Sequence, residues 1–284
     1  VEPNEHIAGI ANKNQLDTIS DYFSIAIANR ISQEYGSASI ITANYMYANI
    51  DNIIEFTHNV KRLLDTEGLF VFQTGYHPKQ MNMNMFDYIY HEHFSYFSVK
   101  VLKQLLGQCG MELIHVKKHP AKGGSIRAIT QHEGGKRDLD ESIELFIREE
   151  GNAGMHNTET YIHFADKIFR YKKKLLELIG QIKSAGHTIV GYGASHSTTT
   201  LLHHFELGEY LEYIVDDNPI KHGLYSPGYH LPVYPSQKLY EERPEYILVL
   251  AWQHQNSIIN RNMKFLNEGG KFIVPLPELK NING

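Results

Sequence analysis

The stretch from Ser39 to Gln73 decides the fold, reading SIITAN at 39–44, DNIIEFTHNVKRLL at 51–64 and LFVFQ at 69–73. The first and last segments are short apolar runs of the kind that form buried strands. The middle segment spaces its apolar residues at helical intervals, at Ile53, Ile54, Phe56, Val60 and Leu63. A strand, a helix and a second strand in this order predict two parallel strands joined by a crossover helix, which is a unit of α/β folds.

The pattern continues downstream of this unit. A helix is expected over 99–110, and strands over 112–116 and 125–130 flank a glycine turn, which predicts an antiparallel hairpin. The polar, glycine-containing stretch 134–158 indicates a boundary, and a long amphipathic helix is expected over 159–185.

The second half starts a new set of strands, over 187–190, 212–215, 246–250 and 271–274. These strands alternate with helical segments, which indicates a second parallel sheet. The predicted fold class is therefore α/β, with two Rossmann-like parallel-sheet domains joined by a helical segment. We expect the first domain at 1–135, the helical connector at 136–185 and the last domain at 186–284.

Composition excludes several classes of protein. The 284 residues carry a formal net charge of −5, and the longest basic run, at 172–174, falls in the predicted long helix, so no nucleic-acid partner is expected. No apolar run reaches the length of a membrane span, and the first residues are not typical of a secretory signal. Cys109 is the only cysteine, which excludes an internal disulfide and a thiolate zinc site and favours a cytoplasmic protein.

The chemistry of the chain is concentrated between Phe86 and Phe97, where Tyr90-His91-Glu92-His93 stands among aromatic residues. Histidine accepts a proton near neutral pH, a carboxylate can orient it, and a phenol can polarise a carbonyl group. A metal site would need a third ligand, which spacing does not identify, so no metal is expected. The remaining alternative is an aromatic strand or loop whose polar residues face water.

A second candidate site follows the strand at 187–190, where Gly191-Tyr192-Gly193 runs into a predicted helix. Glycines let a backbone turn approach a phosphate, and Asp216 and Asp217 at the end of the next strand could bind ribose or sugar hydroxyls. The third glycine of the dinucleotide fingerprint is missing, which weakens a nicotinamide interpretation. The alternative is a plain turn from strand to helix.

Several motifs occur together and in order, and they resemble the S-adenosylmethionine-dependent C-methyltransferases that act on nucleotide-linked keto-deoxysugars. The resemblance covers nearly the whole chain. It is carried by residues 1–4, 43–44, 86–98, 123–127, 191–194, 215–219 and 272–277, which include Tyr-His-Glu-His and Val-Asp-Asp-Asn-Pro.

The family has an N-terminal zinc domain, a central domain that binds S-adenosylmethionine and a C-terminal domain that helps to bind the nucleotide sugar. The resemblance implies that this chain corresponds to the last two parts. On this view the chain starts at the acidic residue of the second cofactor-binding strand, and the zinc domain and the glycine-rich cofactor loop are not within it. Lower affinity for the cofactor is the expected consequence.

The resemblance also implies roles for individual residues. A base removes the proton next to the ketone, and the enolate attacks the methyl group of the cofactor. His93 would be the base, and Glu92 and Tyr90 would orient it or stabilise the enolate oxygen. The expected cofactor-binding residues are Glu2, Ala43 and Asn44, and the expected substrate-binding residues are Tyr96, Gly193, Ala194, Ser195, Asp216 and Asp217.

Asn49 departs from the family, whose members often have histidine there, and an amide cannot accept a proton as histidine does. Two other functions stay open from the sequence. One is a nucleotide-sugar-binding module without activity, and the other is a nicotinamide-dependent sugar oxidoreductase or epimerase that uses Gly191, Gly193 and Asp216.

Overall fold

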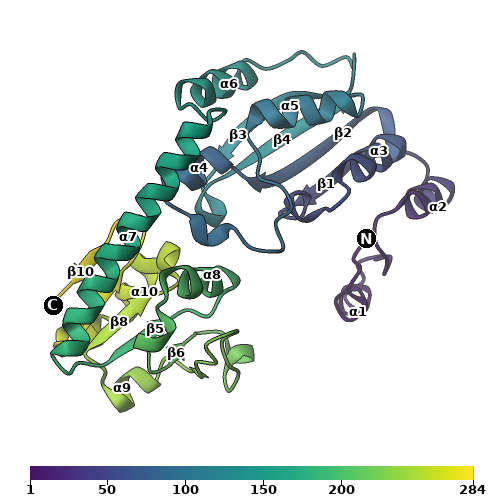
Figure 1. Ribbon diagram of the computed structural model, residues 1–284. Helices are drawn as coiled ribbons and strands as arrows, with labels where there is room; N and C mark the ends of the chain where they lie inside the picture. Colours follow the sequence, from purple (N-terminus) through teal and green to yellow (C-terminus); the bar gives the residue numbers. More distant parts are fainter. Residues whose placement is uncertain (284) are drawn as a thin grey trace. The chain divides into compact units, whose positions relative to one another are not determined.

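The computed structural model describes residues 1–283, which form two compact units (Figure 1). The first unit consists of residues 1–78 and 92–156, and the second consists of residues 79–91 and those from 157 onward. The chain therefore passes into the second unit after residue 78, returns to the first after residue 91, and passes into the second again after residue 156.

A four-stranded mixed sheet with the order β1-β2-β4-β3 forms the centre of the first unit. Strands β1 and β2 are parallel, whereas the pairs β2–β4 and β4–β3 are antiparallel. Both the predicted parallel pair and the predicted hairpin are thereby confirmed. The elements of this unit are α1 (Glu5–Lys13), α2 (Ile25–Tyr35), β1 (Ala38–Asn44), η1 (Tyr47–Asn49), α3 (Ile53–Leu63), β2 (Leu64–Gly75), α5 (Val99–Gln108), β3 (Met111–His119), η3 (Ala121–Gly123), β4 (Ser125–His132) and α6 (Ser142–Asn152).

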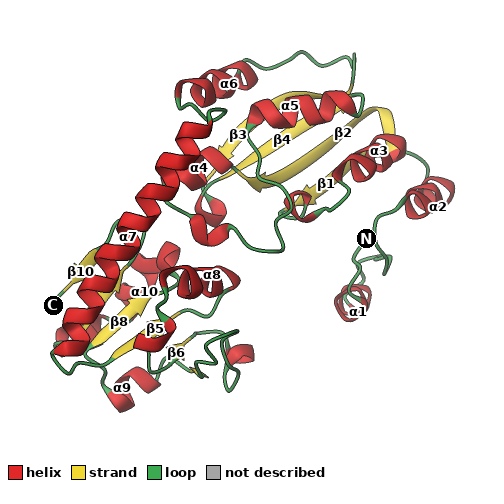
Figure 2. Ribbon diagram, viewed as in Figure 1, coloured by secondary structure: helices red, strands yellow, loops and turns green. Residues whose placement is uncertain are grey.

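Aromatic rings fill the core of the first unit. The ring of Tyr47 lies 4.5 Å from that of Phe72 and 5.6 Å from that of Phe97, centroid to centroid. Helices α3 and α5 cover one face of the sheet (Figure 2), and both contribute side chains to this core. Burying one such ring contributes roughly 2–3 kcal/mol. The packing of Phe97 therefore fixes the chain just after the Tyr-His-Glu-His cluster.

The second unit contains a six-stranded sheet with the order β10-β9-β8-β5-β6-β7, in which only β10 is antiparallel to its neighbour. The long helix α7 packs through a buried stripe that includes Leu175 and Ile179. The elements are η2 (Phe86–Tyr88), α7 (Thr158–Ser184), β5 (Ile189–Tyr192), α8 (His196–Phe205), η4 (Gly208–Tyr210), β6 (Ile214–Val215), η5 (Pro219–Lys221), β7 (Val233–Tyr234), α9 (Lys238–Glu242), β8 (Tyr246–Val249), η6 (Trp252–His254), α10 (Gln255–Arg261), α11 (Met263–Asn267), β9 (Lys271–Val274) and β10 (Lys280–Ile282).

Residues 79–91 belong to the second unit, although the sequence analysis places them within the first domain. Helix α4 (His77–Asn82) begins this excursion. The excursion packs into the second core, where the rings of Phe86 and Phe205 stack with centroids 4.8 Å apart. The apolar residues of this segment therefore find their buried partners more than 100 positions away in sequence, which no local pattern reveals.

The expected helical connector is likewise divided, because α6 belongs to the first unit and α7 to the second. Among residues 1–283, no helix combines the length and the apolar character that crossing a membrane requires.

Candidate functional site

His93 is half-buried in the first unit and packs against an aromatic neighbour. Its imidazole meets the ring of Tyr96 edge-on, with centroids 5.9 Å apart, and Tyr96 in turn lies 5.5 Å from the ring of His77. The backbone is also fixed, because the N–H groups of Phe94 and Ser95 both donate to the carbonyl of Ala48, at 2.9 and 3.2 Å. The structure therefore holds this imidazole in a defined place while leaving part of it accessible.

Glu150 binds residues on both sides of the segment that contains the excursion and the Tyr-His-Glu-His cluster. Its Oε1 accepts a hydrogen bond from the Tyr76 hydroxyl at 3.0 Å and from the Val99 N–H at 2.6 Å, and its Oε2 accepts from the Lys100 N–H at 3.1 Å. Tyr76 precedes the excursion, and Val99 begins α5 after it. The carboxylate is only 1% exposed, and the N-terminus of α5 compensates for its burial. Glu150 was not predicted, because it lies in the polar stretch 134–158 and its partners are 50 to 74 positions away in sequence.

Tyr90 lies with the second unit, unlike Glu92 and His93. Its ring is 6.1 Å from that of Tyr88 and 6.1 Å from that of His196, centroid to centroid. Tyr88 is anchored by a hydrogen bond from its hydroxyl to Oε1 of Gln253, at 2.9 Å. These side chains line a cavity of about 160 Å³ in the second unit, whose walls are Tyr88, Tyr90, Ser195, His196, Ser197, Leu250, Ala251, Trp252, Gln253 and His254.

Asp87 is buried next to Trp252, one of the residues that line this cavity. The indole N–H of Trp252 donates to its Oδ2 at 2.9 Å, whereas its Oδ1 has no hydrogen-bond partner among residues 1–283. Burial raises the pKa of the Asp87 carboxyl to about 7. The hydrogen bond from Trp252 lowers this pKa, but its effect is smaller than that of burial. A carboxyl group with this pKa changes charge near neutrality. Sequence reasoning could not find it, because its partner lies 165 positions away.

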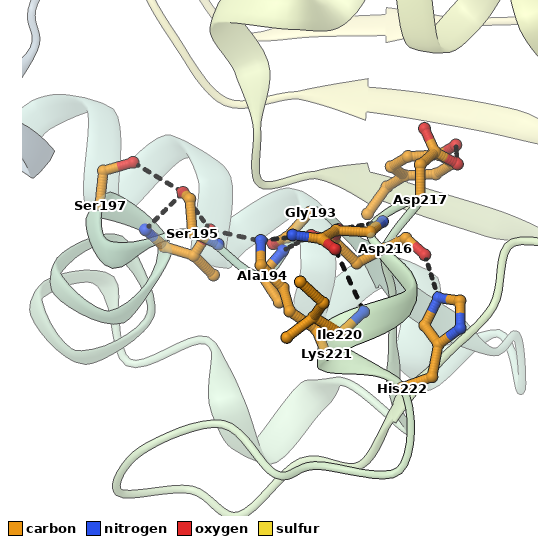
Figure 3. Close-up of polar contacts among 12 residues, drawn as sticks. Gly193, Ala194, Ser195, Ser197, Asp216, Asp217, Ile220, Lys221 and His222 are labelled. Atoms are coloured by element: carbon orange, nitrogen blue, oxygen red, sulfur yellow. Dashed lines mark hydrogen bonds and ion pairs between the residues drawn. The ribbon is translucent and has the colours of Figure 1, made fainter. Parts of the chain in front are cut away.

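The turn after β5 is shaped by Gly193 and Ser195 (Figure 3). Gly193 has φ +104°, and a Cβ added there would lie 2.4 Å from the Cβ of Ala251, so only glycine fits. Ser195 is the N-cap of α8 and forms a capping box with Thr198. The turn is thus rigid and opens directly onto a helix N-terminus, as the sequence predicts.

Asp216 and Asp217 are engaged within the second unit (Figure 3). The Asp216 carboxylate accepts hydrogen bonds from the N–H groups of Ala194 and Asn218, at 2.7 and 2.8 Å, and from Nζ of Lys221 at 3.1 Å. Burial opposes ionisation most strongly, yet these donors together lower the pKa of Asp216 below its usual range. Asp217 accepts from the Tyr192 hydroxyl at 2.8 Å and pairs with Arg261 at 2.8 Å. The two carboxylates therefore hold the turn that contains Gly193 and Ala194.

The three expected cofactor-binding residues lie in the first unit. Ala43 and Asn44 end β1, with Ala43 buried and Asn44 exposed. Glu2 stands before α1, and its Oε1 accepts from the N–H of Asn4 at 2.9 Å. Its Oε2 has no partner among residues 1–283 and can accept a hydrogen bond from a hydroxyl group. Their role in binding the cofactor stays a prediction.

Asn49 offers a further acceptor in the first unit. Its Oδ1 is buried and has no hydrogen-bond partner in the described part of the chain. A buried acceptor of this kind costs about 1–3 kcal/mol unless a ligand or water supplies a donor. Within residues 1–283, no three histidine, cysteine, aspartate or glutamate side chains come together in a group that could hold a metal ion.

Comparison with known proteins identifies the family. A model described as the C-methyltransferase C-terminal domain matches residues 120–277, and a model described as a methyltransferase domain matches residues 1–116. The C-methyltransferase NovU of Streptomyces niveus is 31% identical over all 284 residues, and the chain covers 68% of that protein.

Solved structures give weaker likenesses. A SAM-dependent methyltransferase from Anabaena variabilis is 13% identical, with a TM-score of 0.36 over 46% of this chain and 66% of that one. An O-methyltransferase family protein from Burkholderia thailandensis is 13% identical, with a TM-score of 0.31 over 45% of this chain and 40% of that one. Scores this low carry no argument. The domain models and the relationship to NovU suffice, and they show that the chain belongs to the family of S-adenosylmethionine-dependent C-methyltransferases.

Proposed function

We propose that the protein methylates a carbon next to the ketone of a nucleotide-linked keto-deoxysugar. The observation that carries this proposal is the placement of His93, half-buried against Tyr96 and fixed through the backbone of its neighbours, in a chain that belongs to a C-methyltransferase family. Methylation at carbon requires a base, because a C–H bond must be broken before the carbon can attack a methyl group.

In this mechanism the neutral imidazole of His93 accepts the proton from the carbon beside the ketone, which leaves an enolate on the substrate. Glu92 orients the imidazole and stabilises its charged form, and the Tyr90 hydroxyl donates a hydrogen bond to the enolate oxygen. S-adenosylmethionine supplies the electrophilic methyl group when it is bound. The packing of Tyr96 against His93 keeps the ring in one orientation during proton transfer.

The residues around the cofactor follow from the same proposal. Glu2 would accept hydrogen bonds from the ribose hydroxyls through its available Oε2. Ala43 and Asn44 would line the site where β1 ends, since ligands of parallel strands bind at their carboxyl ends.

For the substrate, we propose Tyr96 as a residue that contacts the sugar, and the turn at Gly193, Ala194 and Ser195 as a further binding element. This turn presents the N-terminus of α8, which favours a negatively charged group. Asp216 and Asp217 would act chiefly by supporting the turn, because their oxygens already accept several hydrogen bonds. In this proposal both units are Rossmann-like domains.

Hydrogen exchange tests the proposal at its first chemical step. In D₂O with S-adenosylhomocysteine, the wild-type protein should exchange the proton beside the ketone of a nucleotide-linked 4-keto-deoxysugar, as followed by NMR. A His93→Asn variant should bind the sugar yet not exchange. Exchange at an undiminished rate in that variant would show that His93 is not the base.

A further inference from the structure

A group of hydrogen-bond donors stands where β1 and β2 end and β4 begins, apart from the residues used so far. Its centre is Gln73, which is only 4% exposed. The Gln73 Oε1 accepts from Nε and Nη2 of Arg127, at 3.2 and 2.9 Å, and its Nε2 donates to the Tyr45 hydroxyl and to Nδ1 of His119. Every hydrogen-bonding position of this buried amide is therefore used to orient three other side chains.

These contacts decide the state of the His119 ring. Its Nδ1 accepts from Gln73 and also from the N–H of Ala121, at 3.3 Å. The proton of the neutral imidazole must then be on Nε2, so Nε2 of His119 is a hydrogen-bond donor.

The backbone around the group is held in unusual conformations. Tyr45 has φ +56° and Lys122 has φ +52°, although neither residue is glycine. Non-glycine residues rarely adopt such conformations, which concentrate at functional sites. Here they bring Nζ of Lys122 to 4.3 Å from the centre of the Tyr45 ring, where a cation–π contact holds it.

Charge is unbalanced in this group. Lys122 and Arg127 are exposed, and Lys117 lies opposite Arg127 in the β3–β4 register. No carboxylate pairs with any of the three within the described residues. Lys118, the neighbour of Lys117 on the other face of β3, does pair with Glu149, at 2.8 Å. Within the described residues, the group thus presents donors and positive charge with no carboxylate paired to them, which suits an oxyanion.

The group is connected to the segment that carries His93. The carbonyl of Gly124, two residues after Lys122, accepts from the N–H of Tyr76 at 3.2 Å. The loop that follows Tyr45 provides the Ala48 carbonyl to which Phe94 and Ser95 donate. Both sides of the donor group are therefore bonded to residues that flank the excursion or adjoin His93.

We propose that Arg127, Lys122 and the Nε2–H of His119, organised by Gln73, bind a phosphate group of the substrate. This inference rests on the proposed function, since it assigns the diphosphate of a nucleotide-linked sugar to a place in the first unit. Arg127 provides a planar fork for phosphate oxygens, and Lys122 provides a point charge. The carboxylate of S-adenosylmethionine has related chemistry and is the other possible source of the oxyanion.

Calorimetry on the whole protein tests this proposal. Binding of uridine and thymidine diphosphates, of the corresponding nucleosides, of inorganic phosphate and of S-adenosylmethionine is measured for the wild type, Arg127→Gln, Arg127→Lys and Lys118→Gln. The last variant is the matched control, because it removes one positive charge from the neighbouring paired position. Thermal unfolding of each variant verifies the fold.

Loss of a charged hydrogen-bonding pair predicts diphosphate binding weaker by roughly 10- to 100-fold in Arg127→Gln, with a smaller loss in Arg127→Lys and none in Lys118→Gln. Nucleoside binding should not change. Unaltered diphosphate affinity in Arg127→Gln would overturn the inference. So would a loss confined to S-adenosylmethionine, because it would assign the oxyanion to the cofactor.

The outcome separates this inference from the proposed function. If the wild type methylates a nucleotide-linked keto-sugar and Arg127→Gln has an unchanged KM, the function stands and the phosphate site fails. If no such sugar is methylated while Arg127→Gln loses diphosphate affinity, the site stands and the substrate assignment fails.

Discussion

The polar ends of the two sheets differ in how their charges are compensated. In the first unit, Lys122 and Arg127 carry positive charge that no carboxylate among residues 1–283 balances. In the second, Lys221 and Arg261 neutralise Asp216 and Asp217 at 3.1 and 2.8 Å. An exposed charge without a partner is available to a ligand, whereas the paired charges of Asp216 and Asp217 stabilise a turn. The first region therefore offers unpaired positive charge, whereas the charged groups of the second region pair with one another and support the turn at Gly193.

The largest expected effect tests the first region. His93→Asn should lower the rate of methyl transfer by about 10²- to 10⁴-fold, because a general base is lost, with the temperature of unfolding little changed. Single-turnover rates and a thermal melt measure the two quantities. A large loss of stability together with activity would mean that His93 supports structure, and the contrast between the regions would weaken.

Gly193→Ala tests the second region, and it should act on stability. The added Cβ meets Ala251 and the backbone is at positive φ, so we expect a loss of roughly 3 kcal/mol or more in the free energy of unfolding. Gly186→Ala is the control, since Gly186 has φ +81° but nothing within 4 Å of the added atom. Denaturant titration compares the two, and equal losses would show that the close approach to Ala251 is unimportant.

Asp87 gives a pH-dependent test. Its pKa is about 7 in the folded protein and about 3.9 in an unfolded chain, so the folded state binds the proton more tightly between these values. Stability should therefore fall as pH rises through this window, by up to about 1.4 kcal/mol per pH unit. Asp87→Asn should remove this slope in urea titrations at pH 5, 6 and 7. If the free energy of unfolding still fell with pH in the variant, groups other than Asp87 would be the cause.

Asp216 should make the free energy of unfolding depend on pH in the opposite direction to Asp87, and by a smaller amount. Its pKa is lowered in the folded state, so its contribution is present above the ordinary pKa of about 3.9 and is lost as pH falls through the folded value. Asp216→Asn should cost about 1 kcal/mol at pH 7 and progressively less in acid. Urea titrations at pH 7, 4 and 3 check this, and an equal cost at every pH would exclude the charge as the cause.

Sequence patterns predicted the local part of this structure. The parallel pair β1–β2, its crossover helix and the β3–β4 hairpin all follow from apolar spacing and turn chemistry within a short window. Helix α2 was missed because it buries only Ile27 and Ala28, and β7 because it has two residues.

The site was predictable only where its residues form a motif. The stretch from Tyr90 to His93 and the turn at Gly193 have unusual composition, which made them visible. No unusual composition surrounds Gln73, Glu150 or Asp87. Their importance comes from hydrogen-bond partners that lie 54, 51 and 165 positions away in sequence. Such side chains acquire a role only when the fold brings strand ends and helix ends together.

The excursion of residues 79–91 has a consequence for how this protein can be divided. Because the chain crosses between the units three times, neither unit is a single continuous stretch, and no single cut yields two complete units. A protease that nicks the loop between α6 and α7 would leave the halves tethered by Phe86 and Asp87, which are buried among side chains from beyond residue 200. Recombination that exchanges the second unit as a cassette would have to exchange Tyr90 and His91 with it, and would separate them from the original Glu92 and His93.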